Sequence, residues 1–293
     1  VASIGTGVVV VGSLVSDSYG ARRCRKLVGL DRWKLRAIRW ADRITTPLVR
    51  LFIANSVSVA SSNREALRIP PSRVTVVHRG RRGDDYLVGE QEAIEAREEL
   101  LAGGTAVILN VARLRELKGQ SELVCSVPAV EREVPGTRLV IAGEGPFRVT
   151  LEALIDRLGL HGSVRLLGYR EDVPTLLSAA DVFVFPSHFE GHPGSLLEAM
   201  FSGKPIVASD TPEHRETVEH GRTALLVPAG DTERLATAIV WMLKHSEEAK
   251  VMGERARQVA LERFSIEEAA RRYEEIYTEL LESIGRARCE SCS

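Results

Sequence analysis

The sequence has no excess of charge of either sign. Lysine and arginine together number 39, and aspartate and glutamate 40. A chain this balanced has no global positive field to attract nucleic acid. No apolar run approaches the roughly 20 residues that a helix needs to cross a bilayer, and no signal peptide pattern follows Val1. These absences predict a cytoplasmic protein with no nucleic-acid partner.

Cysteine is scarce in the sequence, and its spacing gives only a weak metal signal. Cys24 and Cys125 are isolated, and Cys289 and Cys292 form a CxxC in the last five residues. One CxxC without a second ligand pair is a poor zinc site. We interpret it as part of a frayed, reduced tail, and we expect no metal and no other cofactor.

Regular alternation begins near Thr105, where short runs rich in Val, Ile and Leu alternate with helical segments. Continuous apolar strands between helices indicate a parallel sheet covered on both faces. Right-handed crossovers then give a doubly wound α/β fold. The expected strands are 105–112, 138–143, 163–168, 181–187, 205–210 and 223–228, with helices at 118–134, 149–158, 173–180, 195–202 and 214–219.

The two ends of the chain differ from this core. We interpret residues 1–88 as a partial Rossmann-like domain and 89–264 as a complete one, with a polar, Gly-rich linker at 79–92. Residues 265–293 are predicted to form a helix that packs back on the N-terminal domain, followed by the tail. The elements expected outside the core are strands at 8–14, 51–56 and 73–78 and helices at 32–43, 57–67, 232–245, 247–264 and 266–284, the last with Ser265 as N-cap.

Ligands of open parallel sheets bind beyond the carboxyl ends of the strands. After the first strand of the core, Arg113 and Lys118 flank one loop, where two cations could grip a diphosphate or simply be solvated. After the second, Gly143 and Gly145 lie in a turn that a phosphate could approach closely. The dinucleotide fingerprint is incomplete because Arg148 replaces its third glycine, so an ordinary turn fits equally well.

The segment SHFEGHPGSLLEAM (187–200) follows the fourth strand of the core and contains two glutamates. Ser195 and Glu198 match a capping box, in which both side chains bind free backbone N–H groups at a helix start. The functional alternative is that Glu198 accepts two hydroxyls of a ribose. Glu190 lies in the loop before the helix, where a solvated carboxylate is the structural alternative.

Together these motifs resemble glycosyltransferase family 4. The resemblance rests on NVARL (110–114) with Lys118, GEGP (143–146), the run LLGYREDVPTLLSAADVFVFPS (166–187), EGHPGSLLEAM (190–200) and GKPIVASD (203–210). It covers 105–284 closely and 1–88 more loosely. It implies the GT-B type of α/β fold, with two Rossmann-like doubly wound domains, of which the N-terminal one is incomplete here.

This chain departs from the family pattern in several places. Ala112 stands where glycine is usual, and Gly194 stands where asparagine is frequent. The family's first strand, its Gly-rich acceptor loop and the histidine of that domain are not found, since His78 leads into the linker. The resemblance therefore implies a full donor-binding domain beside part of an acceptor domain.

The resemblance also implies roles for individual residues. Glu198 would hold the ribose of the nucleotide, and Glu190 the donor sugar. The cations Arg113 and Lys118 would bind the leaving diphosphate, so that Glu190, Arg113 and Lys118 form the catalytic set without a metal. The implied nucleotide-sugar site is completed by Gly143, Gly145, Gly168, Arg170, Gly191, His192, Gly194 and Ser195, of which Gly168 to Arg170 would face the base.

The function implied is that of a retaining glycosyltransferase. It would transfer a hexose from a UDP-, GDP- or ADP-sugar to a glycan or lipid-linked acceptor, as in polysaccharide biosynthesis. The alternative is a catalytically deficient module or subunit that binds a nucleotide sugar. A third hypothesis is an epimerase or phosphorylase of the same fold. The spacing of Glu190 and Glu198 argues against it.

A basic helix in the N-terminal region predicts a further partner. In RWKLRAIRWADR (32–43), four arginines recur at helical spacing and two tryptophans follow the same rhythm one residue later. Four more basic residues lie at 22–26. This pattern suits peripheral contact of 22–43 with the anionic inner face of the cell membrane. The alternative is that Trp33 and Trp40 pack into the domain core while the arginines are solvated.

Overall fold

The computed structural model describes residues 8–16, 19, 30–190 and 193–290. For residues 30, 32 and 284–290 it describes the backbone alone. The chain forms two compact units. Unit 1 comprises Val1–Gly80 together with Phe264–Ser293, and unit 2 comprises Arg81–Arg263. Within the described residues, no helix combines the length and the apolarity that a membrane span requires.

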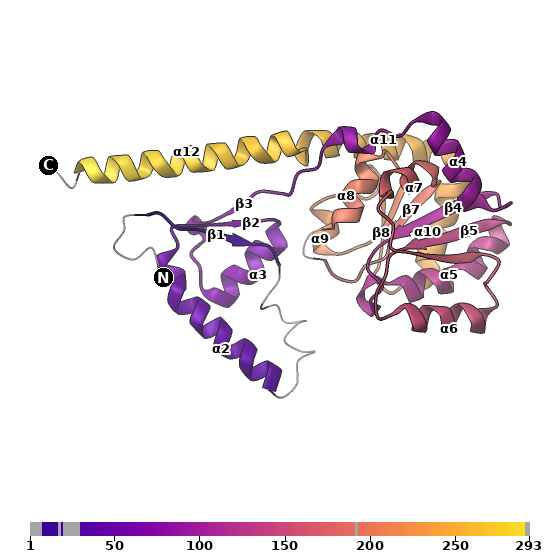
Figure 1. Cartoon of the computed structure of the whole chain (residues 1–293), viewed down its shortest axis with the longest axis horizontal. Coiled ribbons are helices and arrows are strands. Elements are labelled where there is room, and N and C mark those ends of the chain that lie inside the picture. The colour runs from indigo at the N-terminus through magenta and orange to yellow at the C-terminus, as the bar shows by residue number, and fades with distance from the viewer. Residues whose placement is uncertain (1–7, 17–18, 20–29, 191–192, 291–293) are drawn as a thin grey trace. The chain divides into compact units, whose positions relative to one another are not determined.

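Unit 2 is built on a six-stranded, wholly parallel sheet with the strand order β6-β5-β4-β7-β8-β9 (Figure 1). From β4 the chain runs outward to β6, and it then returns beside β4 to continue through β7 to β9. This reversal is the topological switch of doubly wound folds. The strands are β4 (Ala106–Val111), β5 (Thr137–Ala142), β6 (Val164–Gly168), β7 (Val182–Phe185), β8 (Ile206–Ser209) and β9 (Leu225–Val227).

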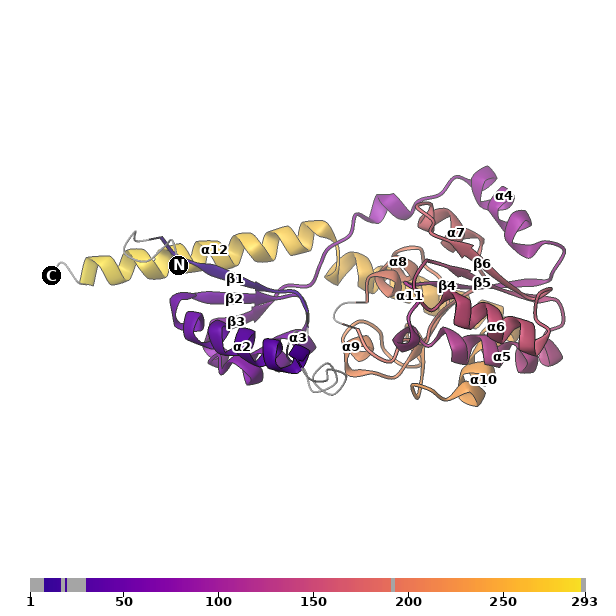
Figure 2. The ribbon, with the colours of Figure 1, turned by 60° about the horizontal axis from the view of Figure 1, so that its bottom comes forward.

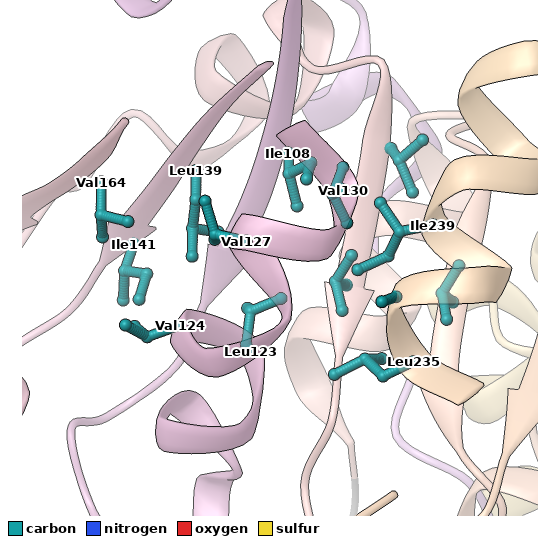
Figure 3. Close-up of a cluster of buried hydrophobic side chains, with 14 of the residues drawn as sticks. Ile108, Leu123, Val124, Val127, Val130, Leu139, Ile141, Val164, Leu235 and Ile239 are labelled. Carbon is teal, nitrogen blue, oxygen red and sulfur yellow. The ribbon is translucent and has the colours of Figure 1, made fainter. Parts of the chain in front are cut away.

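Helices cover both faces of this sheet, which is why its strands are apolar on both sides. The main core lies between the strands and α5, α6 and α10, and Figure 3 shows Leu123 of α5 and Ile239 of α10 approaching the sheet. The helices of unit 2 are α4 (Glu90–Leu101), α5 (Gln120–Glu133), α6 (Arg148–Leu158), α7 (Val173–Ala179), α8 (Gly194–Phe201), α9 (Pro212–Arg215), α10 (Thr232–Lys244) and α11 (Ser246–Arg263).

Unit 1 has a smaller parallel sheet of β1 (Val11–Leu14), β2 (Leu51–Ala54) and β3 (Val74–Val76). One face of this sheet packs on α2 (Leu30–Thr45) and α3 (Val57–Leu67), through the buried Phe52 and Leu67. The other face packs on α12 (Ile266–Glu290) through Ile276. Figure 2 shows α12 running alongside this sheet. The last helix of the chain therefore completes the first unit.

The structure confirms the expected α/β fold class and places nearly every predicted helix and strand within a few residues. Ser265 acts as the predicted N-cap, since its Oγ accepts from the N–H of Glu268 at 3.2 Å. Helix α4 was not predicted, and it begins inside the segment 79–92 that we interpreted as linker. The division between the units falls at Gly80, earlier than the expected boundary at residue 88.

Asn110 joins the two strands at the topological switch. Backbone pairing between β4 and β7 covers only two residue pairs, of which the last is Leu109 with Phe183. Just beyond it, the fully buried Asn110 donates from Nδ2 to the carbonyl of Val184 at 2.8 Å. Because the side chain extends the contact where the backbone ladder ends, Asn110 helps to fix the positions of the two loops that follow.

We predict that Asn110→Leu destabilises the protein by about 1–3 kcal/mol, because a buried acceptor loses its donor. Urea unfolding monitored by circular dichroism measures the change. Ser126→Ala is the matched control, since the buried Ser126 Oγ bonds only to Leu123 of its own helix. An Asn110→Leu midpoint equal to that of the control would contradict the role assigned to this side chain.

Candidate functional site

The carboxyl ends of β4 and β5, the segment after β6 and the start of α8 border a cavity of about 920 Å³ within unit 2. The carboxyl ends of parallel strands meet at one edge of the sheet, which is where ligands of such sheets bind. The residues predicted for the site that line this cavity are Arg113, Gly143, Gly145, Arg170, Ser195 and Glu198. The structure thus gathers side chains from four separate segments of the sequence.

A second cavity of about 850 Å³ lies beside α9, and none of the predicted site residues lines it. Several of its charges are already paired, including Arg215 with Asp210 and Arg222 with Glu219. The cavity at the carboxyl ends of β4 and β5 is therefore the better candidate for the ligand site.

The GEGP turn holds the loop that carries Arg113. A Cβ on Gly143 would lie 2.0 Å from the carbonyl oxygen of Ala112, and one on Gly145 would lie 2.2 Å from that of Leu114. Gly143 also has φ +145°, which other residues rarely adopt. The N–H of Leu114 donates to the carbonyl of Glu144 at 3.0 Å. Glycine is needed here so that two backbones can pack together, which leaves the exposed Arg113 side chain at the cavity.

Lys118 and Glu190 form an ion pair through Nζ and Oε1. Their side chains are 21% and 10% exposed, so both charges are largely removed from water and depend on each other. The lysine also lies 5.9 Å from the centre of the Phe185 ring, at the end of β7. The sequence predicted both residues for the site but not their contact.

The loops after β4 and β7 are bonded to each other around this ion pair. The N–H of His188 donates to the carbonyl of Leu117 at 2.9 Å, and His188 Nε2 lies 2.8 Å from Glu122 Oε1. Gly119 has φ +70°, and a Cβ on it would lie 2.1 Å from the carbonyl oxygen of Pro186. This close approach fixes Lys118, the neighbour of Gly119, against the end of β7.

Glu198 does not take part in the predicted capping box. Helix α8 begins at Gly194, and its N-cap residue, Pro193, has no side chain that can bond the helix start. The carboxylate instead pairs with Arg81, with 3.5 Å between Glu198 Oε1 and Arg81 Nη2. Burial raises the pKa of Glu198, and Arg81 opposes that rise. The capping interpretation was wrong because proline and glycine open the helix one residue earlier than expected.

Residues after β6 form the remaining side of the cavity. Tyr169 is 71% exposed and lines it beside Arg170. The guanidinium of Arg170 is bonded to Asp172 and lies 3.6 Å from Glu99, so it is not a free cation. The carbonyl of Gly168 accepts from the N–H of Gly143 at 2.7 Å, which joins this segment to the GEGP turn.

Sequence reasoning missed four residues at or near the site. Arg81, Tyr86 and Arg115 contact Glu198 or line the cavity. The fourth, His214, is fully buried and near Glu190, and burial lowers its pKa. Its Nδ1 lies 2.6 Å from the carbonyl of Ser209, which makes Nδ1 the protonated nitrogen. Only the cation pattern after the first strand could have pointed to Arg115, and no local signal marks the others.

Gly191 and His192, which were predicted for the donor-sugar site, lie outside the described residues. In the part of the chain that is described, no three His, Cys, Asp or Glu side chains gather as they would around a metal ion.

Comparison with known proteins identifies the family. Residues 91–259 match the model of the family described as "Glycosyl transferases group 1". The match covers more than half of the chain, including both glutamates and both cations of the site. The chain belongs to this family, as the resemblance implied.

Several curated relatives are named as glycosyltransferases or as transferases of a particular sugar. The chain is 31% identical over 199 residues to N-acetyl-alpha-D-glucosaminyl L-malate synthase of Bacillus anthracis, which covers 68% of this chain and 52% of that protein. It is 27% identical over 248 residues to alpha-D-kanosaminyltransferase of Streptomyces kanamyceticus, covering 83% and 64% respectively. The chain thus spans about half to two thirds of the length of these relatives.

Solved structures share the fold. Anabaena Alr3699/HepE in complex with UDP and glucose superposes with a TM-score of 0.82 at 23% identity, covering 94% of this chain and 73% of that one. Sucrose-phosphate synthase from Thermosynechococcus elongatus gives a TM-score of 0.77 at 22% identity, covering 93% and 68%. At this identity the likeness shows the fold alone, which is the GT-B fold expected from the sequence.

Proposed function

We propose that this chain binds a nucleoside diphosphate sugar in the cavity of unit 2 and is a retaining glycosyltransferase. The observation that carries the proposal is the convergence of Arg113, Ser195 and Glu198 on one cavity. The Lys118–Glu190 pair joins the loops that follow β4 and β7. Membership of the family supports the proposal. So do the names of relatives and neighbours, among them the Anabaena protein in complex with UDP and glucose.

The residues suit the parts of such a donor. Glu198 carries two carboxylate oxygens, which is what the two hydroxyls of a ribose require. Tyr169 and Gly168 lie on the β6 side, where the base would be held. Glu190 would accept hydroxyls of the sugar, and its contact with Lys118 brings the sugar end next to a cation.

The reaction needs stabilisation of a leaving diphosphate. The oxygen of the acceptor hydroxyl forms a bond to the anomeric carbon as the bond from that carbon to the diphosphate breaks, through an oxocarbenium-like state. The leaving diphosphate, whose oxygens gain negative charge, would accept the proton of that hydroxyl. In a retaining transfer the new bond lies on the same face as the old one. Arg113 and Lys118 would donate to the phosphate oxygens as their negative charge grows, which stabilises the transition state more than the ground state. The two cations supply this stabilisation without a metal ion.

We also propose that the protein is cytoplasmic and contacts an anionic membrane surface through α2. Trp33 and Trp40 are 72% and 67% exposed, so the alternative that they pack into the core of unit 1 is wrong. Arg36 is exposed beside them. Exposed indoles next to cations suit the interface of an anionic leaflet. A lipid-linked acceptor would lie at such a surface.

Two of the four arginines that were predicted to form a basic face on α2 bond inside unit 1 instead. Arg39 and Arg43 turn toward α3 and donate from Nε to the carbonyl of Ala66, at 3.0 and 2.9 Å. These bonds satisfy a carbonyl in the last turn of α3, as cationic side chains near a helix C-terminus often do. The basic residues at 22–26 lie outside the described residues.

The first prediction from the proposed function is that a nucleoside diphosphate stabilises the protein without metal. A ligand at about 100 times its dissociation constant should add about 2.7 kcal/mol. Thermal unfolding with UDP, GDP or ADP, each with EDTA, measures the effect and identifies the base. The idea fails if none of the three shifts the transition, or if a shift requires added Mg²⁺.

The second prediction separates the two glutamates. Glu198→Gln should weaken binding of the nucleoside diphosphate, because the ribose loses a charged acceptor worth about 1.5–3 kcal/mol. Glu190→Gln should spare the free diphosphate and weaken only the nucleotide sugar. Isothermal titration with both ligands tests the assignment, and equal losses for both ligands in both variants would contradict it.

The third prediction is that the protein sediments with anionic liposomes and less so with neutral ones, and that salt weakens the binding because the charge attraction is screened. The double variant Trp33→Ala, Trp40→Ala should stay in the supernatant. Leu281→Ala, which removes a 68% exposed apolar side chain from α12, is the control. Binding that ignores lipid charge would exclude this role for α2.

A further inference from the structure

Arg81 lies close to both Glu198 and Tyr86, which line the nucleotide cavity. Its Nη2 lies 3.5 Å from Glu198 Oε1, and its positive charge opposes the rise in the pKa of both groups. The Arg81 and Glu198 side chains are 32% and 22% exposed, so this ion pair is partly shielded from water.

The segment after Arg81 is fixed to the helix that carries Glu198. Residues Gly83–Tyr86 form a 3₁₀ turn, and the Tyr86 ring stacks on Phe201 of α8 with centroids 5.5 Å apart and planes at 19°. Gly83 packs on α11, where a Cβ would lie 2.7 Å from Leu261 Cδ2. Phe201 follows Glu198 by three residues and so lies on the same side of α8. Arg81 is therefore held beside Glu198 by packing as well as by charge.

The start of α8 leaves room for this arginine. A Cβ on Gly194 would lie 3.3 Å from Arg81 Nη2, which is tight for a van der Waals contact. Gly194 is the position where the family resemblance leads one to expect asparagine. A side chain there would press on the guanidinium, so the glycine and the arginine fit each other.

The ionisation of Glu198 depends on the same contact. Burial raises the pKa of Glu198 and the nearby Arg81 lowers it. Tyr86 stays neutral, because burial and the charge of Glu198 raise its pKa to about 12. The other charged groups that line the cavity include Asp85, Arg113 and Arg115. Without Arg81, the carboxyl group would take up a proton at a higher pH.

We propose that Arg81 is a positioning residue of the nucleotide site, which holds the Glu198 carboxylate, ionised, where it accepts the ribose hydroxyls. The inference rests on the proposed function, because it takes Glu198 as the ribose acceptor. It assigns to Arg81 no direct contact with the ligand. Arg81 acts through Glu198, and the stacking of Tyr86 on Phe201 fixes the segment that carries Arg81 to α8.

The test is the affinity of Arg81→Gln for whichever of UDP, GDP and ADP most stabilises the protein, titrated between pH 5.5 and 8.5. We expect about a tenfold loss at neutral pH, the size of one charge-assisted hydrogen bond. The loss should grow toward pH 5.5, because Glu198 protonates earlier without its partner. The ligand's own titration is common to both proteins, so the ratio of their affinities reports the protein alone.

Two variants separate this role from general effects. Arg82→Gln removes the same charge from the exposed neighbouring residue and should leave both the affinity and its pH profile unchanged. Arg81→Lys keeps the charge and should restore most of the low-pH affinity. An Arg81→Gln profile that is parallel to that of the wild type at every pH would overturn the proposal.

The double variant Arg81→Gln, Glu198→Gln tests whether Arg81 acts through Glu198. We expect it to bind like Glu198→Gln alone, because a positioning residue has no effect once its target is gone. Additive losses would mean that Arg81 meets the ligand itself, and they would overturn the inference. If Glu198→Gln binds as tightly as the wild type, the ribose assignment fails. If Glu198→Gln lowers the affinity and Arg81→Gln leaves it unchanged, the ribose assignment stands and this inference fails.

Discussion

The site depends on the position of β4 between two parallel neighbours. β5 pairs along its whole length on one side, and β7 pairs with two residues on the other before the strands separate. Asn110 bridges the strands at the point of separation. Because parallel strands end at the same edge, the loops that carry Arg113 and Glu190 must both begin there. Arg113 lines the cavity, and the Lys118–Glu190 ion pair joins the two loops at the same edge of the sheet.

Charge pairing governs what this edge can bind. Glu190 is 8% exposed, and a carboxylate so far from water requires a partner, which Lys118 provides. A phosphate that approached Lys118 would share the ammonium group with Glu190, and the sugar hydroxyls would take over some of the carboxylate's bonds. When a nucleotide sugar binds, its hydroxyls would therefore replace the bonds that Glu190 loses as Lys118 turns to the phosphate. A diphosphate alone would weaken the contact of Lys118 with Glu190 and offer the carboxylate no replacement.

Much of this could be predicted from the sequence, because strand and helix periods are local and the edge of a parallel sheet follows from them. Arg113, Glu198 and the GEGP turn lie at one cavity for that reason, and their roles there stay predictions. Helix α4 was missed because its sequence EQEAIEAREELL has a weak apolar stripe, and only Ala96 and Leu100 are buried. The partner of Glu198 could not be predicted, since Arg81 lies far away in the sequence and no pattern joins the two.

The pairing of Arg81 with Glu198 also explains why a motif match is not enough to describe this site. The glutamate follows the family pattern, but its surroundings combine Gly194 with an arginine from the segment that opens unit 2. For the proposed ribose contact, Glu198 has to be both ionised and correctly oriented. Burial acts against its charge, and the nearby guanidinium of Arg81 favours it. The segment that carries Arg81 is fixed to α8 by the stacking of Tyr86 on Phe201, and a Cβ at residue 194 would lie only 3.3 Å from Arg81 Nη2.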